Sequence, residues 1–152
     1  SKGRFDNDKI FKVTKMIKDA GINVGGNFIF GLPGDTHETM TETLDLAKKL
    51  NCEYANFYVA MSYPGSKLYE EEKRDEMLEN WAEYSQFGYH TKPRPTVYLE
   101  PKTILQFRDN AFNDYYSSER YQNMVLEKFG PETLEHIKKM LEHKLRRKLL
   151  EE

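Results

Sequence analysis

Residues 24–36 read VGGNFIFGLPGDT, an apolar segment that ends abruptly in a Gly-Leu-Pro-Gly turn. The apolar part favours a β-strand, and the residues after the turn favour the start of a helix. In α/β proteins, ligands collect at the carboxyl ends of parallel strands, so the tight turn from Gly31 to Gly34 is a candidate binding surface. The same two glycines could instead supply only the dihedral angles of an ordinary strand-to-helix turn.

The segments around this turn predict an alternation of helices and strands. Hydrophobic periodicity and turn residues indicate a helix at 6–20, a strand at 22–30, a helix at 37–50 and a strand at 54–61. Asp35 and Glu38 have the spacing of a capping box for the second of these helices. This order predicts the α/β class, with parallel strands covered on both faces and a right-handed crossover between them.

The second half of the sequence predicts a mainly helical organisation. A turn at 62–66 should follow the second strand and lie on the same rim of the sheet as the first turn. We expect a short charged helix at 66–78, an irregular segment pinned by aromatic residues at 80–103, and helices at 103–120, 121–128 and from Pro131 onward. These differences divide the chain into residues 1–78 and residues 79–152.

The last helix is expected to be amphipathic. Its inward stripe consists of Leu134, Ile137, Leu141 and Leu145. Its basic residues, Arg147 among them, are interleaved with glutamates, which favours a solvated face over a nucleic-acid site.

Two motifs give the sequence a resemblance to a known family. The segment FIFGLPGDT at 28–36 is followed by a helix, a second strand and the segment YPGSKLY at 63–69. Together they resemble the C-terminal half of the core of radical S-adenosylmethionine enzymes, within the branch of anaerobic cyclases and methyltransferases that often carry an N-terminal cobalamin-binding domain. The resemblance implies the C-terminal part of a partial TIM-type (β/α) barrel. A looser similarity in the run RDNAFNDYY at 108–116 points to the helical extension after such a barrel.

The resemblance implies S-adenosylmethionine and a [4Fe–4S] cluster as cofactors, and it allows cobalamin as a third. In this family three cysteines of a CxxxCxxC loop hold the cluster, because such clusters need thiolate ligands. The sequence has one cysteine, Cys52, for which a buried apolar role is favoured over a reactive one. We therefore expect a fragment that begins after the cluster loop, with the cluster ligands upstream in a parent chain.

The resemblance also assigns site residues around the first turn. In the family, the strand before this turn places its backbone and an apolar side chain against the adenine of S-adenosylmethionine, in a pattern often written GxIxGxxE. Ile29 and Gly31 match this pattern, whereas Asn27 stands in the first glycine position and Gly34 in the glutamate position. The expected cofactor contacts are Asn27, Ile29, Gly31, Leu32, Pro33, Gly34 and Tyr63. Tyr63 could also be a packed aromatic residue before a Pro-Gly turn, and no catalytic residue or metal ligand is assigned.

Composition limits the partners of this chain. With 152 residues, 38% of them hydrophobic, it can form one domain with a core, and a net charge of −2 gives no reason to expect nucleic-acid binding. No apolar stretch approaches the ~20 residues needed to span a bilayer, and a single cysteine without a secretory leader favours a cytoplasmic protein. The expected partners are a small-molecule substrate and the rest of the parent chain.

An incomplete barrel also creates a packing problem. Parallel strands that are apolar on both faces need cover on both. Either the helices from Thr103 to Leu150 fold back over the exposed face, which the aromatic residues between Trp81 and Tyr121 favour, or two copies associate through the open edge. The open edge of the sheet is expected to cause weak self-association in addition.

Two other functions stay open from the residues themselves. One is a βα enzyme that binds phosphate at the start of the helix after the turn, which Asp35 disfavours because its charge repels phosphate. The other is a noncatalytic helical interaction module on a βα scaffold, which would show an exposed apolar groove without a pocket for adenine.

Overall fold

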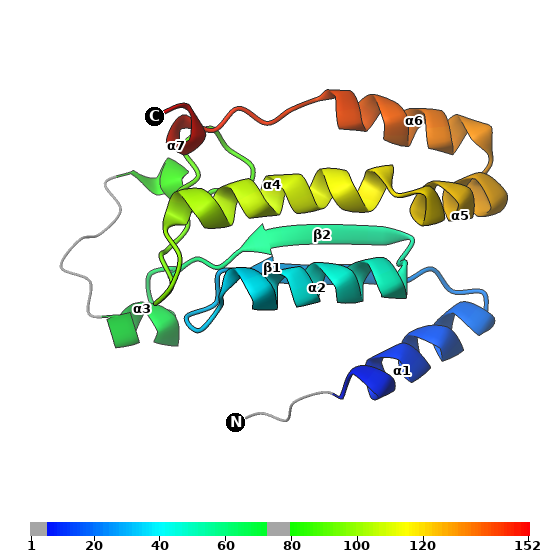
Figure 1. The fold of residues 1–152 in the computed structure, drawn as a ribbon, viewed down its shortest axis with the longest axis horizontal. Helices are drawn as coiled ribbons and strands as arrows, with labels where there is room; N and C mark the ends of the chain where they lie inside the picture. Colours follow the sequence, from blue (N-terminus) through cyan, green and yellow to red (C-terminus); the bar gives the residue numbers. More distant parts are fainter. Residues whose placement is uncertain (1–5, 73–79) are drawn as a thin grey trace.

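The computed structural model describes residues 6–72 and 80–152 and shows a two-stranded parallel sheet with helices packed against it (Figure 1). In chain order the elements are α1 (Asn7–Asp19), β1 (Gly25–Phe30), α2 (His37–Leu50), β2 (Tyr54–Val59), α3 (Lys67–Glu72), the 3-10 helix η1 (Trp81–Tyr84), α4 (Pro101–Ser117), α5 (Glu119–Phe129), α6 (Pro131–Glu142) and α7 (Lys148–Glu151). The α/β class predicted from the sequence is confirmed.

Some predictions fall outside the described residues. The short helix predicted at 66–78 corresponds to α3, and the remainder of that prediction lies in the part that is not described. The boundary between residues 1–78 and 79–152 lies there too and stays a prediction. Among the described residues, no helix combines the length and the apolar character needed to cross a membrane.

β1 and β2 pair in parallel and in register over six residues each. The helix between them, α2, begins and ends at the predicted residues. β1 begins at Gly25 rather than at residue 22, because the Glu53 carboxylate accepts the N–H of Val24 at 2.8 Å just before pairing starts. β2 ends at Val59 rather than at residue 61, because β1 turns away at Gly31, whose φ is +81°.

The described helices cover one face of the sheet. Burial alternates along both strands: Phe30 and Phe57 are fully buried, whereas Ile29 and Tyr54 are 42% and 59% exposed. The covering side chains come from α2 and α4 and include Met40, Leu44, Ile104 and Leu105. Helix α4 therefore folds back over the sheet, but onto the face that α2 also covers rather than onto the exposed face. The expected cover on both faces is wrong, because α4 packs beside α2 on the same face.

The outer edge of β2 is closed by side chains instead of by a third strand. The Tyr116 hydroxyl accepts the N–H of Ala55 at 3.0 Å and donates to the Ala55 carbonyl at 2.7 Å. One strand pleat further on, Arg108 Nε donates to the carbonyl of Phe57 at 2.8 Å. Helix α4 thus bonds to the strand backbone where a neighbouring strand would pair.

A third side chain completes this closure from the segment after η1. Gln86 accepts the N–H of Val59 and donates to its carbonyl, each at 3.0 Å. Alternation along a strand directs residues 55, 57 and 59 to the same edge. A bare strand edge is a template for pairing with another chain, so the predicted self-association would have to use the edge of β1 instead.

Tyr116→Phe should destabilise the fold, because it leaves the buried N–H and C=O of Ala55 without their partner. The expected loss in the free energy of unfolding is about 1–3 kcal/mol, measured by urea denaturation. Tyr54→Phe is the matched control, since it removes the same hydroxyl from an exposed side chain of β2 and should change the free energy by less than about 0.5 kcal/mol. Equal losses in the two variants would contradict the closing role of Tyr116.

The C-terminal part corrects two sequence predictions. Helix α6 ends at Glu142, so Leu145 lies beyond it and is 46% exposed rather than part of an inward stripe. Arg147, expected in solvent, is 1% exposed. Both differences have one cause: the backbone becomes extended at His143, and the helical spacing that defined the two faces ends there.

Glu53 connects the start of β2 to three other segments. Its carboxylate accepts the N–H of Val24 at 2.8 Å, and it lies 2.9 Å from Nζ of Lys128 and 3.5 Å from Nζ of Lys18. Burial alone would raise the pKa of this carboxyl group. The hydrogen bonds from Val24 and Lys128 outweigh burial, so the pKa lies below its usual value.

Glu53→Gln should make the fold less sensitive to acid. Because the pKa of Glu53 is lowered by folding, its contribution to stability is present above the pKa of an unfolded glutamate, about 4.3, and is lost as the pH falls through the folded value. Between about pH 7 and about pH 3, the unmodified chain should lose more free energy of unfolding than Glu53→Gln. The exposed Glu127→Gln should behave like the unmodified chain. A loss in Glu53→Gln as large as in the unmodified chain would refute this assignment.

Candidate functional site

Two loops define the candidate site, and both follow the carboxyl ends of the parallel strands. Residues 31–34 leave β1, and residues 61–66 leave β2. Because the strands are parallel, both loops lie at the same edge of the sheet, as predicted. We call these two loops the rim.

Asp35 fixes the first rim loop. One of its carboxylate oxygens accepts the N–H groups of both Gly31 and Leu32, each at 2.9 Å. The other accepts the hydroxyl of Thr39 at 2.9 Å. A single carboxylate therefore joins the loop backbone to the first turn of α2.

The helix after the loop is capped one residue later than predicted. Thr36 is the N-cap of α2: its hydroxyl accepts the N–H of Thr39 at 3.3 Å, and the Thr39 hydroxyl accepts the N–H of Thr36 at 3.0 Å. The predicted capping box of Asp35 and Glu38 is wrong, because Asp35 uses its carboxylate on the loop. Two threonines form the reciprocal pair in its place.

The segment before α4, and α4 itself, hold the loop from its other side. The Thr96 hydroxyl donates to the carbonyl of Asp35 at 2.9 Å. Gly31 has a φ of +81°, and a Cβ there would lie 2.8 Å from Cγ2 of Ile104. Position 31 therefore suits glycine for its backbone conformation and for lack of space.

Gly31→Ala should cost at least about 2 kcal/mol of unfolding free energy, from a strained φ and from contact with Ile104. Gly34→Ala makes the same change in the same loop, but a Cβ there meets nothing within 4 Å. It should stay within about 0.5 kcal/mol of the unmodified chain. Thermal and urea unfolding of the two variants measure the difference, and an equal loss in both would show that the contact with α4 does not matter.

The face of the sheet not covered by α2 and α4 carries two of the predicted contacts, Asn27 and Ile29. We call this the open face; its side chains belong to Asn27, Ile29, Tyr54, Asn56 and Tyr58. Asn56 Nδ2 donates to Asn27 Oδ1 at 3.0 Å, and Ile29 is in register with Tyr58. The structure therefore brings amide, phenol and aliphatic side chains together next to the rim.

The other predicted contacts lie on the rim itself, with different exposure. Leu32, Pro33 and Gly34 are exposed, whereas Gly31 is buried beneath them. The loop thus presents residues 32–34 to solvent and uses Gly31 for packing.

Tyr63 contacts the last residue of η1, Tyr84, and the nearby Gln86. Its ring stacks on Tyr84 with centroids 5.9 Å apart. Its hydroxyl donates to the Tyr84 carbonyl at 3.4 Å and accepts from Gln86 Nε2 at 3.2 Å. Within the described ranges, no hydrogen bond or ring contact joins Tyr63 to residues 31–34. Tyr63 therefore lies on the rim but apart from the first loop.

The described residues offer no metal centre. No group of three His, Cys, Asp or Glu side chains among them is placed to hold an ion. Cys52 is 2% exposed, and burial raises the pKa of its thiol. This burial agrees with the packed role predicted for it.

The sequence predictions missed a buried charge cluster beside β2. Arg108 and Arg147 both pair with Asp109, and the arginine side chains are 4% and 0% exposed. A signal was present in the spacing: Arg108 falls between Ile104 and Ala111 on the buried stripe of α4, where a cation requires a partner.

Comparisons with known proteins show similarity to enzymes. No family model matches the chain. It is 38% identical over 73 residues to an uncharacterized methyltransferase of Pyrococcus horikoshii, and 30% identical over 80 residues to the bacteriochlorophyllide d C-8(2)-methyltransferase of Chlorobaculum tepidum. It is 35% identical over 60 residues to the anaerobic magnesium-protoporphyrin IX monomethyl ester cyclase of Rubrivivax gelatinosus.

These similarities cover part of each protein. They span 47%, 51% and 40% of this chain, but only 16%, 18% and 11% of the three relatives, in the same order. The chain is therefore similar to methyltransferases and a cyclase over a segment that makes up less than a fifth of each.

Proposed function

We propose that this chain is the C-terminal part of the barrel of a radical S-adenosylmethionine enzyme, together with the start of its helical extension. In this proposal the rim and the open face contact the adenosyl part of the cofactor and form part of the substrate wall. The observation that carries it is the one-sided sheet: helices cover one face, and the other presents Asn27, Ile29, Asn56 and Tyr58 beside the rim. A (β/α) barrel covers its strands with helices on the outside and turns the other face toward its interior.

The similarity to two methyltransferases and a cyclase supports an enzyme of this kind. The two sequence motifs behind the resemblance, 28–36 and 63–69, both lie at the carboxyl ends of the parallel strands. The substrate and the reaction of the whole protein depend on parts of the parent beyond this chain.

Part of the rim fits an adenosyl group. Ile29 is 42% exposed next to the loop and offers an apolar contact to a flat ring. Gly34 is exposed with open space where a Cβ would stand, so a ligand can approach the backbone closely there. These two residues are the best-placed contacts among those predicted.

Other backbone groups of the loop are already bonded inside the protein. Asp35 accepts the N–H groups of Gly31 and Leu32, and the N–H of Val97 donates to the carbonyl of Pro33 at 3.3 Å. These groups do not serve a ligand while the loop keeps this conformation. Gly31 and Leu32 therefore shape the site rather than read the adenine.

The residues of this chain do not fit an iron–sulfur cluster. Its one cysteine is buried, and such a cluster needs several accessible thiolates. In the proposal the cluster ligands belong to a preceding part of the parent, and no residue of this chain is assigned to the cluster or to cobalamin.

The outer edge of β1 is where we propose that the preceding strand of the parent pairs. Gly25, Asn27 and Ile29 direct their backbone groups to that edge, and in the described ranges no strand pairs with it. The outer edge of β2 is closed by Tyr116 and Gln86, together with the arginine between them. A further parallel strand can therefore add at β1.

Binding of S-adenosylmethionine to the full-length parent tests the proposal. Ile29→Ser should raise the Kd about tenfold or more in equilibrium dialysis, because burying an isoleucine contact contributes ~1.5–3 kcal/mol. Ile22→Ser is the matched control: it alters an isoleucine that is 58% exposed, precedes β1 and lies outside the rim. Its Kd should stay within about twofold of the unmodified parent.

Cluster reconstitution on the isolated chain is a second test of the proposal. Anaerobic treatment with iron and sulfide should give no [4Fe–4S] absorbance, since the chain has a single, buried cysteine. A stable stoichiometric cluster on the isolated chain, or equal loss of binding in the two isoleucine variants, would overturn the proposal.

A further inference from the structure

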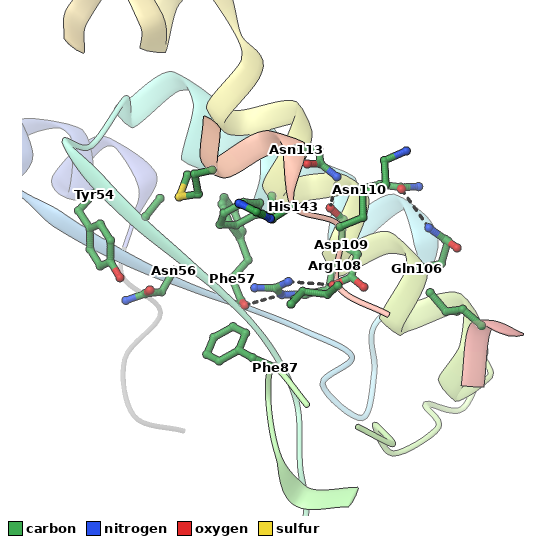
Figure 2. A pocket seen from close by; sticks show the side chains of 16 residues that line it. Tyr54, Asn56, Phe57, Phe87, Gln106, Arg108, Asp109, Asn110, Asn113 and His143 are labelled. Carbon is green, nitrogen blue, oxygen red and sulfur yellow. Dashed lines mark hydrogen bonds and ion pairs between the residues drawn. The ribbon is translucent and has the colours of Figure 1, made fainter. Parts of the chain in front are cut away.

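A cavity of about 520 Å³ lies between the outer edge of β2, α4 and the C-terminal segment (Figure 2). Its size is that of small-molecule sites, which range over roughly 300–1,000 Å³. It runs along residues 54–57, the amino-terminal part of β2, and its lining includes none of the rim residues. It shares Tyr54 and Asn56 with the open face but is distinct from the rim.

The wall of this cavity contains an unbalanced buried charge. Arg108 Nη1 lies 2.8 Å from one carboxylate oxygen of Asp109. Arg147 approaches both oxygens of the same carboxylate, at 2.9 Å and 3.0 Å. Elsewhere in the described residues, neither arginine forms an ion pair with a second acid. Two cations thus share one anion.

The remaining contacts of both guanidinium groups are to neutral atoms. Arg108 donates to the carbonyl of Phe57, and Arg147 donates to the carbonyls of Gln86 and Gly88 and to the Thr91 hydroxyl. Taking a charge out of water is costly unless an opposite charge offsets it. The cluster therefore retains an excess of one positive charge with little access to water.

Arg108 is the cation of this cluster that lines the cavity, beside Asp109. Figure 2 shows it reaching from α4 toward Phe57, with Phe87 on one side and His143 on the other. Its guanidinium carbon lies 5.0 Å and 5.5 Å from the ring centroids of Phe87 and Phe112. Nε and Nη1 are bonded as described, and within the described part of the chain Nη2 has no hydrogen-bond partner.

The rest of the lining is apolar or neutral, with one further cation. Apolar walls come from Phe57, Phe87, Phe112, Met140, Leu145 and Leu150. Lys144 is exposed and also lines the cavity, and Asp109 is its one acidic lining residue among those described. Such a surface suits an anion whose body is apolar.

We propose that this cavity binds a small organic acid with a flat apolar body, whose carboxylate pairs with Nη2 of Arg108 while its rings pack among the aromatic and aliphatic walls. The carboxylate offsets the excess charge of the Arg108, Asp109 and Arg147 cluster. An inorganic anion would balance the charge but would leave the apolar walls unfilled.

Calorimetric titration of the 152-residue chain with 2-naphthoate tests this site, with 2-naphthamide as the uncharged counterpart. The carboxylate should bind about tenfold tighter or more, because hydrogen bonds to a charged group exceed those to a neutral one. Inorganic phosphate should bind at least about tenfold more weakly than 2-naphthoate, because it lacks the apolar body. Equal affinity for the amide would overturn the charge pairing, and equal affinity for phosphate would overturn the apolar part of the proposal.

Two charge variants locate the binding in the cavity. Lys144→Glu reverses an exposed charge of the lining and should weaken 2-naphthoate about threefold or more. Lys138→Glu makes the same change on the exposed surface of α6, outside the lining, and should alter the affinity less than about twofold. The same effect from both lysines would mean that the anion is attracted by net charge alone.

Arg108→Lys tests the pairing itself. It keeps the charge but loses Nη2, so the preference for 2-naphthoate over 2-naphthamide should fall by about tenfold. Because Arg108 also bonds to β2, Phe87→Ala provides a second test on an exposed loop residue; it should weaken 2-naphthoate about fivefold through loss of one wall. An unchanged affinity in Phe87→Ala, or an unchanged preference in a folded Arg108→Lys, would overturn the proposal.

Discussion

The fold depends on how the outer edge of β2 is closed. A sheet of two strands is marginal by itself, because it leaves half of its backbone groups at bare edges. Here Tyr116 and Arg108 from α4, and Gln86 from the preceding segment, bond to the strand at every second residue. The helix therefore does more than cover apolar side chains. Its polar residues fix its position along the strand, which apolar packing alone would leave freer to slide.

This placement of α4 couples the two regions of interest. Near its start, Ile104 occupies the space where a side chain at Gly31 would lie, so the helix limits how closely the first rim loop can approach it. One turn later, Arg108 bonds to Phe57 and forms part of the cavity wall. A displacement of α4 along its axis would alter the loop and the cavity together. The rim and the cavity share a support although no rim residue lines the cavity.

Local patterns predicted the parts of the fold that local physics decides. The period of α2 and the parallel pairing of the strands follow from apolar spacing and from a crossover of sufficient length. Long-range partners decided the rest. Arg147 is buried because it pairs with Asp109. The two residues are 38 positions apart in sequence, so no local pattern indicates that pairing. Ile29 is exposed because the second layer that its character calls for is absent from the described residues.

The N-cap of α2 could have been either of two neighbouring residues, and a sequence pattern separates such candidates poorly. Asp35 and Thr36 are neighbours with similar capping ability, and the sequence pattern selected the aspartate. The fold uses the threonine for the helix because the aspartate is engaged by the N–H groups of Gly31 and Leu32. The same pattern therefore predicted the helix start correctly and its cap wrongly.

The hydrogen bonds between Asp35 and the first rim loop have a thermodynamic consequence. Confining the backbone of one residue costs about 1–2 kcal/mol in conformational entropy. In residues 31–33 folding has already confined the backbone, because Gly31 and Leu32 bond to the Asp35 carboxylate and the N–H of Val97 bonds to the carbonyl of Pro33. A ligand that arrives at the rim meets a preorganised surface and loses none of its binding energy to ordering the loop. The affinity of the proposed rim site would therefore depend partly on a carboxylate that bonds to the protein's own backbone.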